Sequence, residues 1–231
     1  VSIPAAVRDP SLGFDSNTYV LPRTGGQGVP LVSVNYESAK LELLRINGRN
    51  LIRQITDGRF LRVLDGYDRN DIANNLGETV WKGVVEIESK PNQRVVTAVP
   101  IYQILPSTQP GVYLLLAAPP EQTQADDWAQ QATQWLIVTD MGMTSMSGAD
   151  GLNLFVRSLQ DGEALRKVEV NLIARNNGIL ASTETDRDGL AHFDSGLLRG
   201  EGGREAVAVV ASRKDGYFAF LDLTQAAFDL S

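Results

Sequence analysis

Hydrophobic residues recur along this chain with the spacing of β-strands. They alternate with polar residues or form short continuous runs, and clusters of Gly, Pro, Asn and Asp separate the runs. The first part of the chain contains six predicted strands, Val29–Asn35, Lys40–Ile46, Val80–Glu88, Arg94–Tyr102, Val112–Ala117 and Gln134–Thr139. Together they predict one antiparallel β-sandwich.

The composition changes after Asp140, and a second series of predicted strands follows. The segment Met141–Gly148 consists of Met and small residues, and it is interpreted as a linker. Turn pairs such as Asp188-Gly189 separate the apolar runs beyond it. These runs contain six further predicted strands, Leu152–Leu159, Val168–Ala174, Ile179–Thr185, Leu190–Phe193, Ala206–Ser212 and Tyr217–Asp222. A second antiparallel sandwich is therefore expected.

The length of 231 residues fits two such domains, because domains most often contain about 100 to 150 residues. We expect an extended lead-in over residues 1–16, a first sandwich over 17–140 and a second over 141–231. Two segments depart from strand spacing. Asn50–Tyr67 has apolar residues at helical spacing, which predicts a helix or an irregular excursion, and Glu121–Ala132 has the composition of a short helix or a loop. The fold class is all-β.

Composition narrows the range of functions. The net charge is −7 with both signs scattered, whereas nucleic-acid binding needs clustered Lys and Arg, so no nucleic-acid partner is expected. The chain contains no Cys, which excludes disulfides, thiolate metal ligands and a Cys nucleophile. No apolar run reaches the ~20 residues of a membrane span. The sequence starts at Val1 with neither an initiator Met nor a signal peptide, so we expect a fragment of a longer protein.

The single histidine is the first candidate for catalysis. His192 stands two residues before Asp194 in a predicted strand, which suggests a general base beside a carboxylate. A catalytic triad also needs a positioned nucleophile, and no motif supplies one. A zinc site needs three or four nitrogen or sulfur ligands, which one histidine without cysteine does not provide. We therefore interpret His192 as a structural residue.

Two loop motifs suggest ligands but are better explained as turns. Asp186 and Asp188 followed by Gly189 resemble the start of a calcium loop, but Leu197 stands where an EF-hand has its bidentate Glu. Neither of the glycine stretches, Arg23–Gly28 and Arg199–Arg204, has the Lys followed by Ser or Thr that a phosphate-binding loop needs. No metal or cofactor is predicted.

The tryptophans divide into two groups. Trp128 follows Asp126 and Asp127 in a polar segment, where an aromatic ring and two carboxylates suggest a carbohydrate site. Adjacent residues of an extended chain point apart, so the pair does not form the opposed acid and base of a glycosidase. Trp81 and Trp135 alternate with aliphatic residues and are predicted core residues. No catalytic residue is predicted, and the chain is not expected to be an enzyme.

Several motifs in order resemble bacterial α2-macroglobulin-like proteins. In the second half the similar segments are Trp135–Met143, Asp150–Leu152, Val168–Val170, Ala174–Gly178, Thr185–Gly189, Gly196–Gly200, Phe220–Leu223 and Ala227–Ser231. In the first half they are Tyr19–Pro22, Gly28–Asn35, Leu64–Tyr67 and Val80–Gly83. The resemblance covers nearly the whole chain and implies two consecutive macroglobulin-like domains of fibronectin type III-like topology.

The resemblance also implies a function and a location. The parent is expected to be a periplasmic lipoprotein, anchored to the inner membrane, that traps proteases after they cleave a bait region. Its thioester is formed from Cys and Gln, so this Cys-free segment is expected to be non-catalytic scaffold. The implied partners are other macroglobulin domains of the same chain, target proteases and a peptidoglycan synthase or other envelope protein. An adhesion or carbohydrate-binding module at Trp128 is the alternative.

Overall fold

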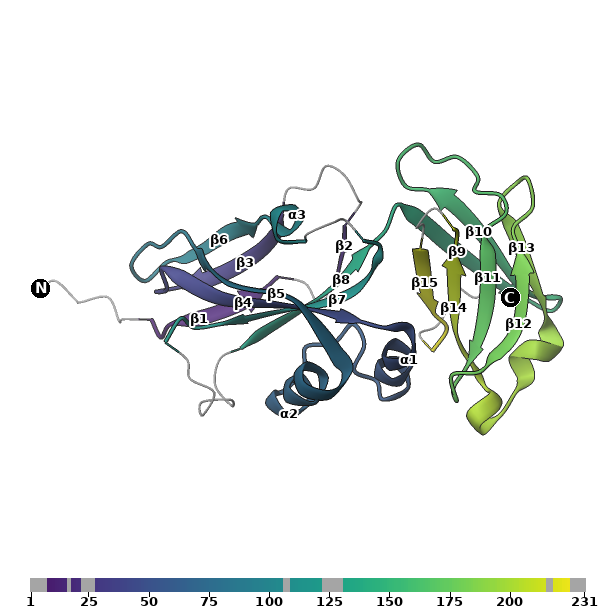
Figure 1. Ribbon diagram of the computed structural model, residues 1–231, viewed down its shortest axis with the longest axis horizontal. Helices are drawn as coiled ribbons and strands as arrows, with labels where there is room; N and C mark the ends of the chain where they lie inside the picture. Colours follow the sequence, from purple (N-terminus) through teal and green to yellow (C-terminus); the bar gives the residue numbers. More distant parts are fainter. Residues whose placement is uncertain are drawn as a thin grey trace, which may run out of the picture.

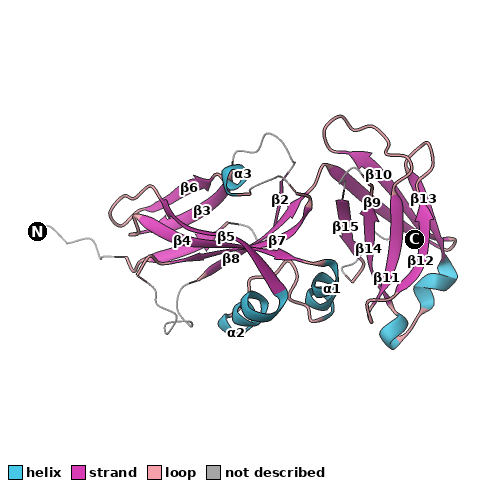
Figure 2. Ribbon diagram, viewed as in Figure 1, coloured by secondary structure: helices cyan, strands magenta, loops and turns pink. Residues whose placement is uncertain are grey.

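The computed structural model describes residues 8–15, 18–21, 28–105, 109–121, 131–214 and 218–224. Two β-sandwiches follow one another along the long axis, and the helices α1 and α2 lie below the first one in the view of Figure 1. Strands dominate both halves, as the colouring in Figure 2 shows. No helix in the described ranges has the length and apolarity needed to cross a membrane.

The first sandwich has a three-stranded sheet in the order β1-β3-β6 and a five-stranded sheet in the order β2-β8-β7-β4-β5. Its strands are β1 (Ser11–Phe14), β2 (Thr18–Leu21), β3 (Val29–Val34), β4 (Ser38–Ile46), β5 (Gly77–Glu86), β6 (Arg94–Val99), β7 (Gly111–Ala118) and β8 (Ala132–Val138). Strand β2 runs parallel to β8, and the other pairs are antiparallel. The predicted strands in this half are confirmed within a few residues, except at Arg94–Tyr102. That strand ends at Val99 because Pro100 cannot donate to the ladder, and the short helix α3 (Ile101–Ile104) follows.

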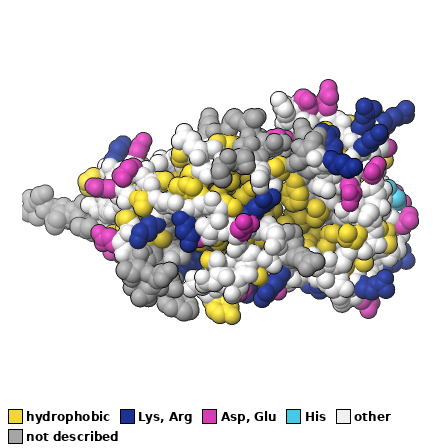
Figure 3. All heavy atoms as spheres, viewed as in Figure 1, with side chains coloured by type: hydrophobic (Ala, Val, Ile, Leu, Met, Phe, Trp, Pro, Cys, Tyr) yellow, Lys and Arg dark blue, Asp and Glu magenta, His cyan; other side chains and the backbone are white. Residues whose placement is uncertain are grey.

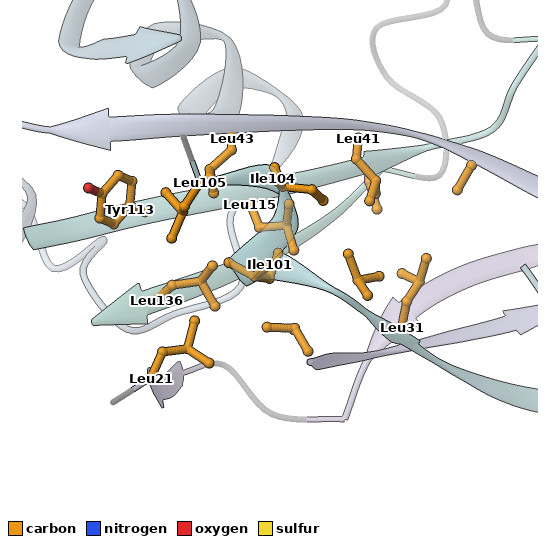
Figure 4. Close-up of a cluster of buried hydrophobic side chains, with 14 of the residues drawn as sticks. Leu21, Leu31, Leu41, Leu43, Ile101, Ile104, Leu105, Tyr113, Leu115 and Leu136 are labelled. Carbon is orange, nitrogen blue, oxygen red and sulfur yellow. The ribbon is translucent and has the colours of Figure 1, made fainter. Parts of the chain in front are cut away.

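The core of the first sandwich lies between its two sheets. Alternate residues of β4 and β7 point into it, among them Leu41, Leu43 and Leu115, all at most 2% exposed. Figure 4 shows these side chains converging with Leu31 of β3 and Ile101 of α3. The period of two along each strand thus places one set of apolar residues in this core.

A helical insertion between β4 and β5 covers the other face of the five-stranded sheet. It contains α1 (Gly48–Thr56), α2 (Gly66–Asp71) and a π-helical turn, η1 (Ile72–Leu76). Asn47 caps α1 by accepting a hydrogen bond from the backbone N–H of Asn50 at 3.0 Å, and Asp65 caps α2 in the same way. The helix or irregular excursion predicted over Asn50–Tyr67 contains both, because turns and loop separate α1 from α2.

The second sandwich consists of the sheets β13-β10-β9 and β12-β11-β14-β15. Its strands are β9 (Met141–Gly148), β10 (Gly151–Ser158), β11 (Glu169–Ala174), β12 (Ile179–Glu184), β13 (Leu190–Asp194), β14 (Ala206–Ser212) and β15 (Phe218–Asp222). Two short 3₁₀ helices, η3 (Ser195–Arg199) and η4 (Gly202–Arg204), join β13 to β14. Leu154, Leu172 and Val209 are fully buried between the sheets. Two all-β sandwiches are thus confirmed.

One sequence expectation is wrong. The predicted linker Met141–Gly148 is strand β9, which pairs with β10 along its whole length. Small residues have low intrinsic strand preference, but the free backbone of β10 provides hydrogen-bond partners that outweigh this preference. Within the expected lead-in over residues 1–16, β1 pairs with β3, and the lead-in itself stays a prediction. The proposed boundary at residue 141 stays a prediction; β8 ends at Val138 and β9 begins at Met141.

Candidate functional site

Both ring nitrogens of His192 face acceptor side chains of the same sheet. Its Nδ1 lies 2.9 Å from the Oδ1 atom of Asn153 on β10, and its Nε2 lies 3.5 Å from the carboxylate of Asp194. The carboxylate of Asp194 is itself 89% exposed. Neither Asn153 nor Asp194 is a Ser, Thr or Cys nucleophile, so these two contacts of His192 do not form a triad.

Asp186 forms a tight turn rather than a calcium loop. Its Oδ1 accepts hydrogen bonds from the backbone N–H groups of Asp188 and Leu190, both at 2.9 Å. Gly189 has φ of +76°, which L-residues rarely adopt. Across the described ranges, no three His, Cys, Asp or Glu side chains come close enough together to hold a metal ion.

Replacing Gly189 with alanine is expected to lower the free energy of unfolding by about 1–3 kcal/mol. The new Cβ would combine positive φ with an approach of 2.5 Å to the carbonyl oxygen of Val156. Gly162→Ala is the matched control, because Gly162 has φ of +75° but no atom within 4 Å of the added Cβ. Urea denaturation of both variants measures the difference. An equal loss in the two would show that the close contact at Gly189 contributes nothing.

The structure describes only some of the other candidate residues from the sequence. Most of the predicted helix or loop Glu121–Ala132 lies outside the described residues, including Asp126, Asp127 and Trp128, and so do Arg23–Gln27 of the first glycine stretch. The second glycine stretch lies in the connection from β13 to β14 and contains the 3₁₀ helix η4, where the carbonyl of Gly203 accepts a hydrogen bond from the backbone N–H of Asn176 at 3.0 Å. Trp135 is fully buried, as predicted. Trp81 is half-buried at the margin of the first core.

A groove of about 880 Å³ crosses the outer face of the five-stranded sheet beside α2. Glu42 is the one carboxylate among its described lining residues. It accepts a hydrogen bond from the Thr79 hydroxyl at 2.7 Å and pairs with Lys82 at 2.8 Å. A single carboxylate held by a cation and a hydroxyl is not an acid and base pair, so the groove has no catalytic arrangement.

The largest feature that the sequence reasoning missed is an apolar contact between the two sandwiches, here called the junction cluster. Its buried residues in the first sandwich are Leu44, Ile46, Leu51, Ile52, Ile55, Phe60, Leu64, Ile72, Leu76, Val112, Leu114, Leu116 and Trp135. Its residues in the second sandwich are Ile173, Val207 and Ala208, with Val210, Phe218 and Phe220 partly buried. Figure 1 shows α1 between the five-stranded sheet and the β14–β15 edge, and Figure 3 shows hydrophobic side chains gathered at this junction. One continuous cluster therefore spans both sandwiches.

A β-bulge enlarges the contribution of the second sandwich. Ile173 of β11 pairs with Ala208, whereas Ala174 pairs with Ala206, so Val207 is the extra residue of β14. A bulge bends the strand and reverses the alternation of its side chains. Val207 and Ala208 consequently both contribute to the junction cluster, while Val209 enters the second core.

Three aromatic rings form the centre of the junction cluster. Phe60 packs edge-on against Trp135 with ring centroids 5.1 Å apart, and against Phe220 of the second sandwich with centroids 5.4 Å apart. The indole N–H of Trp135 donates to the carbonyl of Arg62 at 3.2 Å, which orients the ring. Edge-to-face pairs of this kind add about 0.5–1.5 kcal/mol each to the burial of their area.

Thr139 adds polar contacts where the chain passes from β8 to β9. Its hydroxyl accepts from the N–H of Met141 at 2.9 Å and bonds to the carbonyl oxygen of Phe218 in β15. Its own backbone N–H donates to the carbonyl of Leu21 at 3.0 Å. This buried side chain thus connects the inter-sandwich crossing to the last strand of the second sandwich.

An ionic network holds the helical insertion in place. Arg59 donates to the carboxylate of Asp71 and pairs with that of Asp68, both at 2.8 Å. Asp71 also accepts a hydrogen bond from Asn75 at 2.9 Å. The hydrogen bonds from Asn75 and Arg59 hold the pKa of the Asp71 carboxyl below its usual value.

The network is expected to make stability depend on pH. Because the pKa of Asp71 is lowered by folding, its contribution is present above the unfolded value of about 4 and is lost as pH falls through the folded value. Asp71→Asn should cost about 1 kcal/mol at pH 7 and progressively less at acid pH. Denaturation across the pH range measures this, with Asp188→Asn, at a 74% exposed carboxylate, as control. A cost independent of pH would contradict the ionic explanation.

Gln54 on α1 is a buried polar residue whose side chain has no partner within the described ranges. Its side chain is fully buried, and neither its Oε1 nor its Nε2 has a hydrogen-bond partner. A buried unpaired amide costs about 1–3 kcal/mol, so Gln54→Met, of similar volume, is expected to raise stability by about 1 kcal/mol. Thermal unfolding measures the change, and exposed Gln93→Met serves as control. A fall in stability would show that the amide is satisfied in solution.

Two family models match the chain in sequence order. Residues 13–126 match the bacterial alpha-2 macroglobulin MG2 domain, and residues 138–231 match the bacterial alpha-2-macroglobulin MG3 domain. The first match covers most of the first sandwich, leaving out β8, and the second covers the second sandwich.

Relatives and solved structures agree with this assignment. Alpha-2-macroglobulin of Escherichia coli is 26% identical over 96% of this chain, and that of Xylella fastidiosa is 25% identical over 96%. The chain spans 13% of the length of each of these relatives. Trypsin-activated alpha-2-macroglobulin from E. coli superimposes with a TM-score of 0.75 at 22% identity, over 96% of this chain and 14% of that one. An E. coli alpha-2-macroglobulin structure spanning domains NIE-MG1 superimposes with a TM-score of 0.68 at 24% identity, over 93% of this chain and 97% of that one. At these identities the structures show the shared fold.

Proposed function

Because the chain belongs to the bacterial alpha-2-macroglobulin family, we propose that it is a non-catalytic scaffold segment of a protease trap in the cell envelope. The junction cluster is the observation that carries this proposal. Its apolar residues make the two sandwiches one continuous packed unit, which is the property a structural segment needs. The name of one structural relative supports a link to proteases, since that protein was activated by trypsin.

The proposal extends to the parent protein and its surroundings. The parent is a periplasmic protein, anchored to the inner membrane as a lipoprotein, and other macroglobulin domains of the same chain are the direct partners of this segment. Proteases and a peptidoglycan synthase or other envelope protein are partners of the parent. The Cys of a family thioester has no counterpart in this Cys-free chain, so any covalent capture is performed elsewhere in the parent.

The test compares the segment with its parent. The purified chain, in molar excess over trypsin, is expected to leave cleavage of a large protein substrate unchanged. The full-length parent is expected to protect the substrate, and a parent lacking residues 1–231 to lose that protection. Stoichiometric inhibition by the isolated chain, or full protection by the truncated parent, would refute the scaffold role.

A further inference from the structure

The chain passes from the first sandwich to the second within one peptide unit. The backbone N–H of Thr139 donates to the carbonyl of Leu21 at 3.0 Å, which continues the pairing of β2 with β8 by one residue. The carbonyl of Asp140 accepts from the backbone N–H of Leu159 at 2.7 Å, which continues the pairing of β9 with β10. Thr139 therefore belongs to the ladder of the first sandwich, and Asp140 to that of the second.

This arrangement confines rotation through the connection to two residues. The backbone has only two soft dihedrals per residue, φ and ψ. Because the two ladders hold the peptide groups on either side of this pair, a change of angle through the connection has to occur at the φ and ψ of Thr139 and Asp140. Hinge movements of proteins use a few such residues between packed units. The connection is therefore the place where a hinge between the sandwiches would lie.

The side chain of Thr139 restrains this connection. It is 3% exposed, and its hydroxyl accepts from the N–H of Met141 at 2.9 Å and bonds to the carbonyl oxygen of Phe218, with the carbonyl oxygen of Met141 at 3.2 Å. Threonine is branched at Cβ and stiff at χ1, so its hydroxyl keeps a fixed direction from the backbone. Hydrogen bonds are directional, whereas apolar burial in the junction cluster is not. The hydroxyl thus adds a directional link from the connection to β15.

We propose that Thr139 is the positioning residue that sets the angle between the two sandwiches. The junction cluster holds the sandwiches together, and the Thr139 hydroxyl selects one orientation among those that apolar contact permits. The significance of this angle rests on the proposed scaffold role, because an angle fixed here determines where domains joined to either sandwich lie. The experiment measures the angle itself in the isolated chain, so its outcome does not depend on protease trapping.

The experiment measures a distance between one label on each sandwich. The chain contains no Cys, so nitroxide labels attach only at introduced cysteines. Val96→Cys on β6 and Ile179→Cys on β12 are suitable, because these side chains are 46% and 62% exposed and lie on different sandwiches. Pulsed electron paramagnetic resonance gives the distribution of label distances. One narrow distribution is expected with Thr139 in place, and a broader distribution with a shifted mean is expected in Thr139→Val, which keeps the branched shape but loses the hydroxyl.

Hydrogen exchange supplies a second readout at the same place. In Thr139→Val the N–H of Met141 loses its acceptor, and its exchange is expected to become about tenfold faster, as the loss of one hydrogen bond predicts. Thr139→Ser retains the hydroxyl and is expected to keep both the label distances and the slow exchange. Thr139→Ala removes the hydroxyl without adding apolar bulk, and it repeats the test if the Val variant does not fold.

Thr185→Val is the matched control within the second sandwich. Thr185 is 4% exposed, and its hydroxyl accepts from the N–H of Val168 at 3.0 Å and donates to the carbonyl of Leu165 at 2.6 Å. The control therefore loses the same kind of buried hydroxyl away from the connection. It is expected to lower the temperature of thermal unfolding and to leave the label distances unchanged.

Three results would overturn the proposal. Label distances unchanged by the loss of the Thr139 hydroxyl would show that the junction cluster alone sets the angle. Equal broadening in Thr185→Val would assign the effect to a general loss of stability. Broadening in Thr139→Ser as large as in Thr139→Val would show that the hydroxyl is not the group responsible.

Discussion

Phe60→Ala is expected to lower the free energy of unfolding by about 3–5 kcal/mol, as large-to-small core substitutions of Phe do. Phe60 is 3% exposed and contacts an aromatic ring on each side of the junction, Trp135 in the first sandwich and Phe220 in the second. Its removal leaves a cavity where the two sandwiches meet. Unfolding in urea, followed both by tryptophan fluorescence and by far-ultraviolet circular dichroism, measures the loss.

The same variant is also expected to separate the unfolding of the two sandwiches. All three Trp residues precede the second sandwich in the sequence, so fluorescence reports on the unfolding of the first sandwich and circular dichroism on that of both. The two signals should coincide in the wild type and diverge in Phe60→Ala. Phe193→Ala is the control, because Phe193 is 2% exposed but lies in the second core away from the junction. Coincident transitions in Phe60→Ala would show that the junction cluster does not couple the sandwiches.

Leu114→Ala and Leu115→Ala are each expected to cost about 2–5 kcal/mol. The two residues are neighbours on β7, and both are fully buried. Leu115 points into the core between the sheets, whereas Leu114 belongs to the junction cluster on the opposite face. In a sheet with one solvated face, one of two consecutive residues would tolerate truncation.

Chemical denaturation of the two Leu variants tests whether the five-stranded sheet is buried on both faces. Val84→Ala on the edge strand β5 is the control, since Val84 is 58% exposed and its loss should change stability little. If Leu114→Ala behaved like Val84→Ala, the helical insertion and second sandwich would not seal that face in solution.

The helical insertion shows why the junction cluster could not be predicted from the sequence. Its apolar residues at helical spacing predicted a helix, and α1 confirms that prediction. Helical periodicity does not show, however, that Phe60 would reach Phe220, which is separated from it by the rest of the first sandwich and most of the second. One feature of the sequence did indicate that both faces of this sheet are covered. The continuous apolar run Val112–Ala117 is typical of a strand buried on both faces, and it indicated that something must cover the outer face of the sheet.

Strand β9 shows that local sequence pattern can also miss a strand. Its residues Met141–Gly148 have weak strand preference, so local pattern predicted a linker. The decisive contribution comes from β10, whose backbone groups need partners on both sides within the sandwich. Local composition does not contain that information, because the partner strand is supplied by the fold.

The sequence by itself determined the all-β class, most strands and their turns, and the absence of cysteine chemistry. These features depend on alternation, turn residues and composition, which act over a few neighbouring positions. Only the tertiary structure decided that the helical insertion packs against β14 and β15, that one apolar cluster spans both sandwiches, and that Thr139 bonds to both of them. Those features depend on which distant surfaces meet, and hydrophobic burial, which drives such contacts, is non-directional and does not specify its partner.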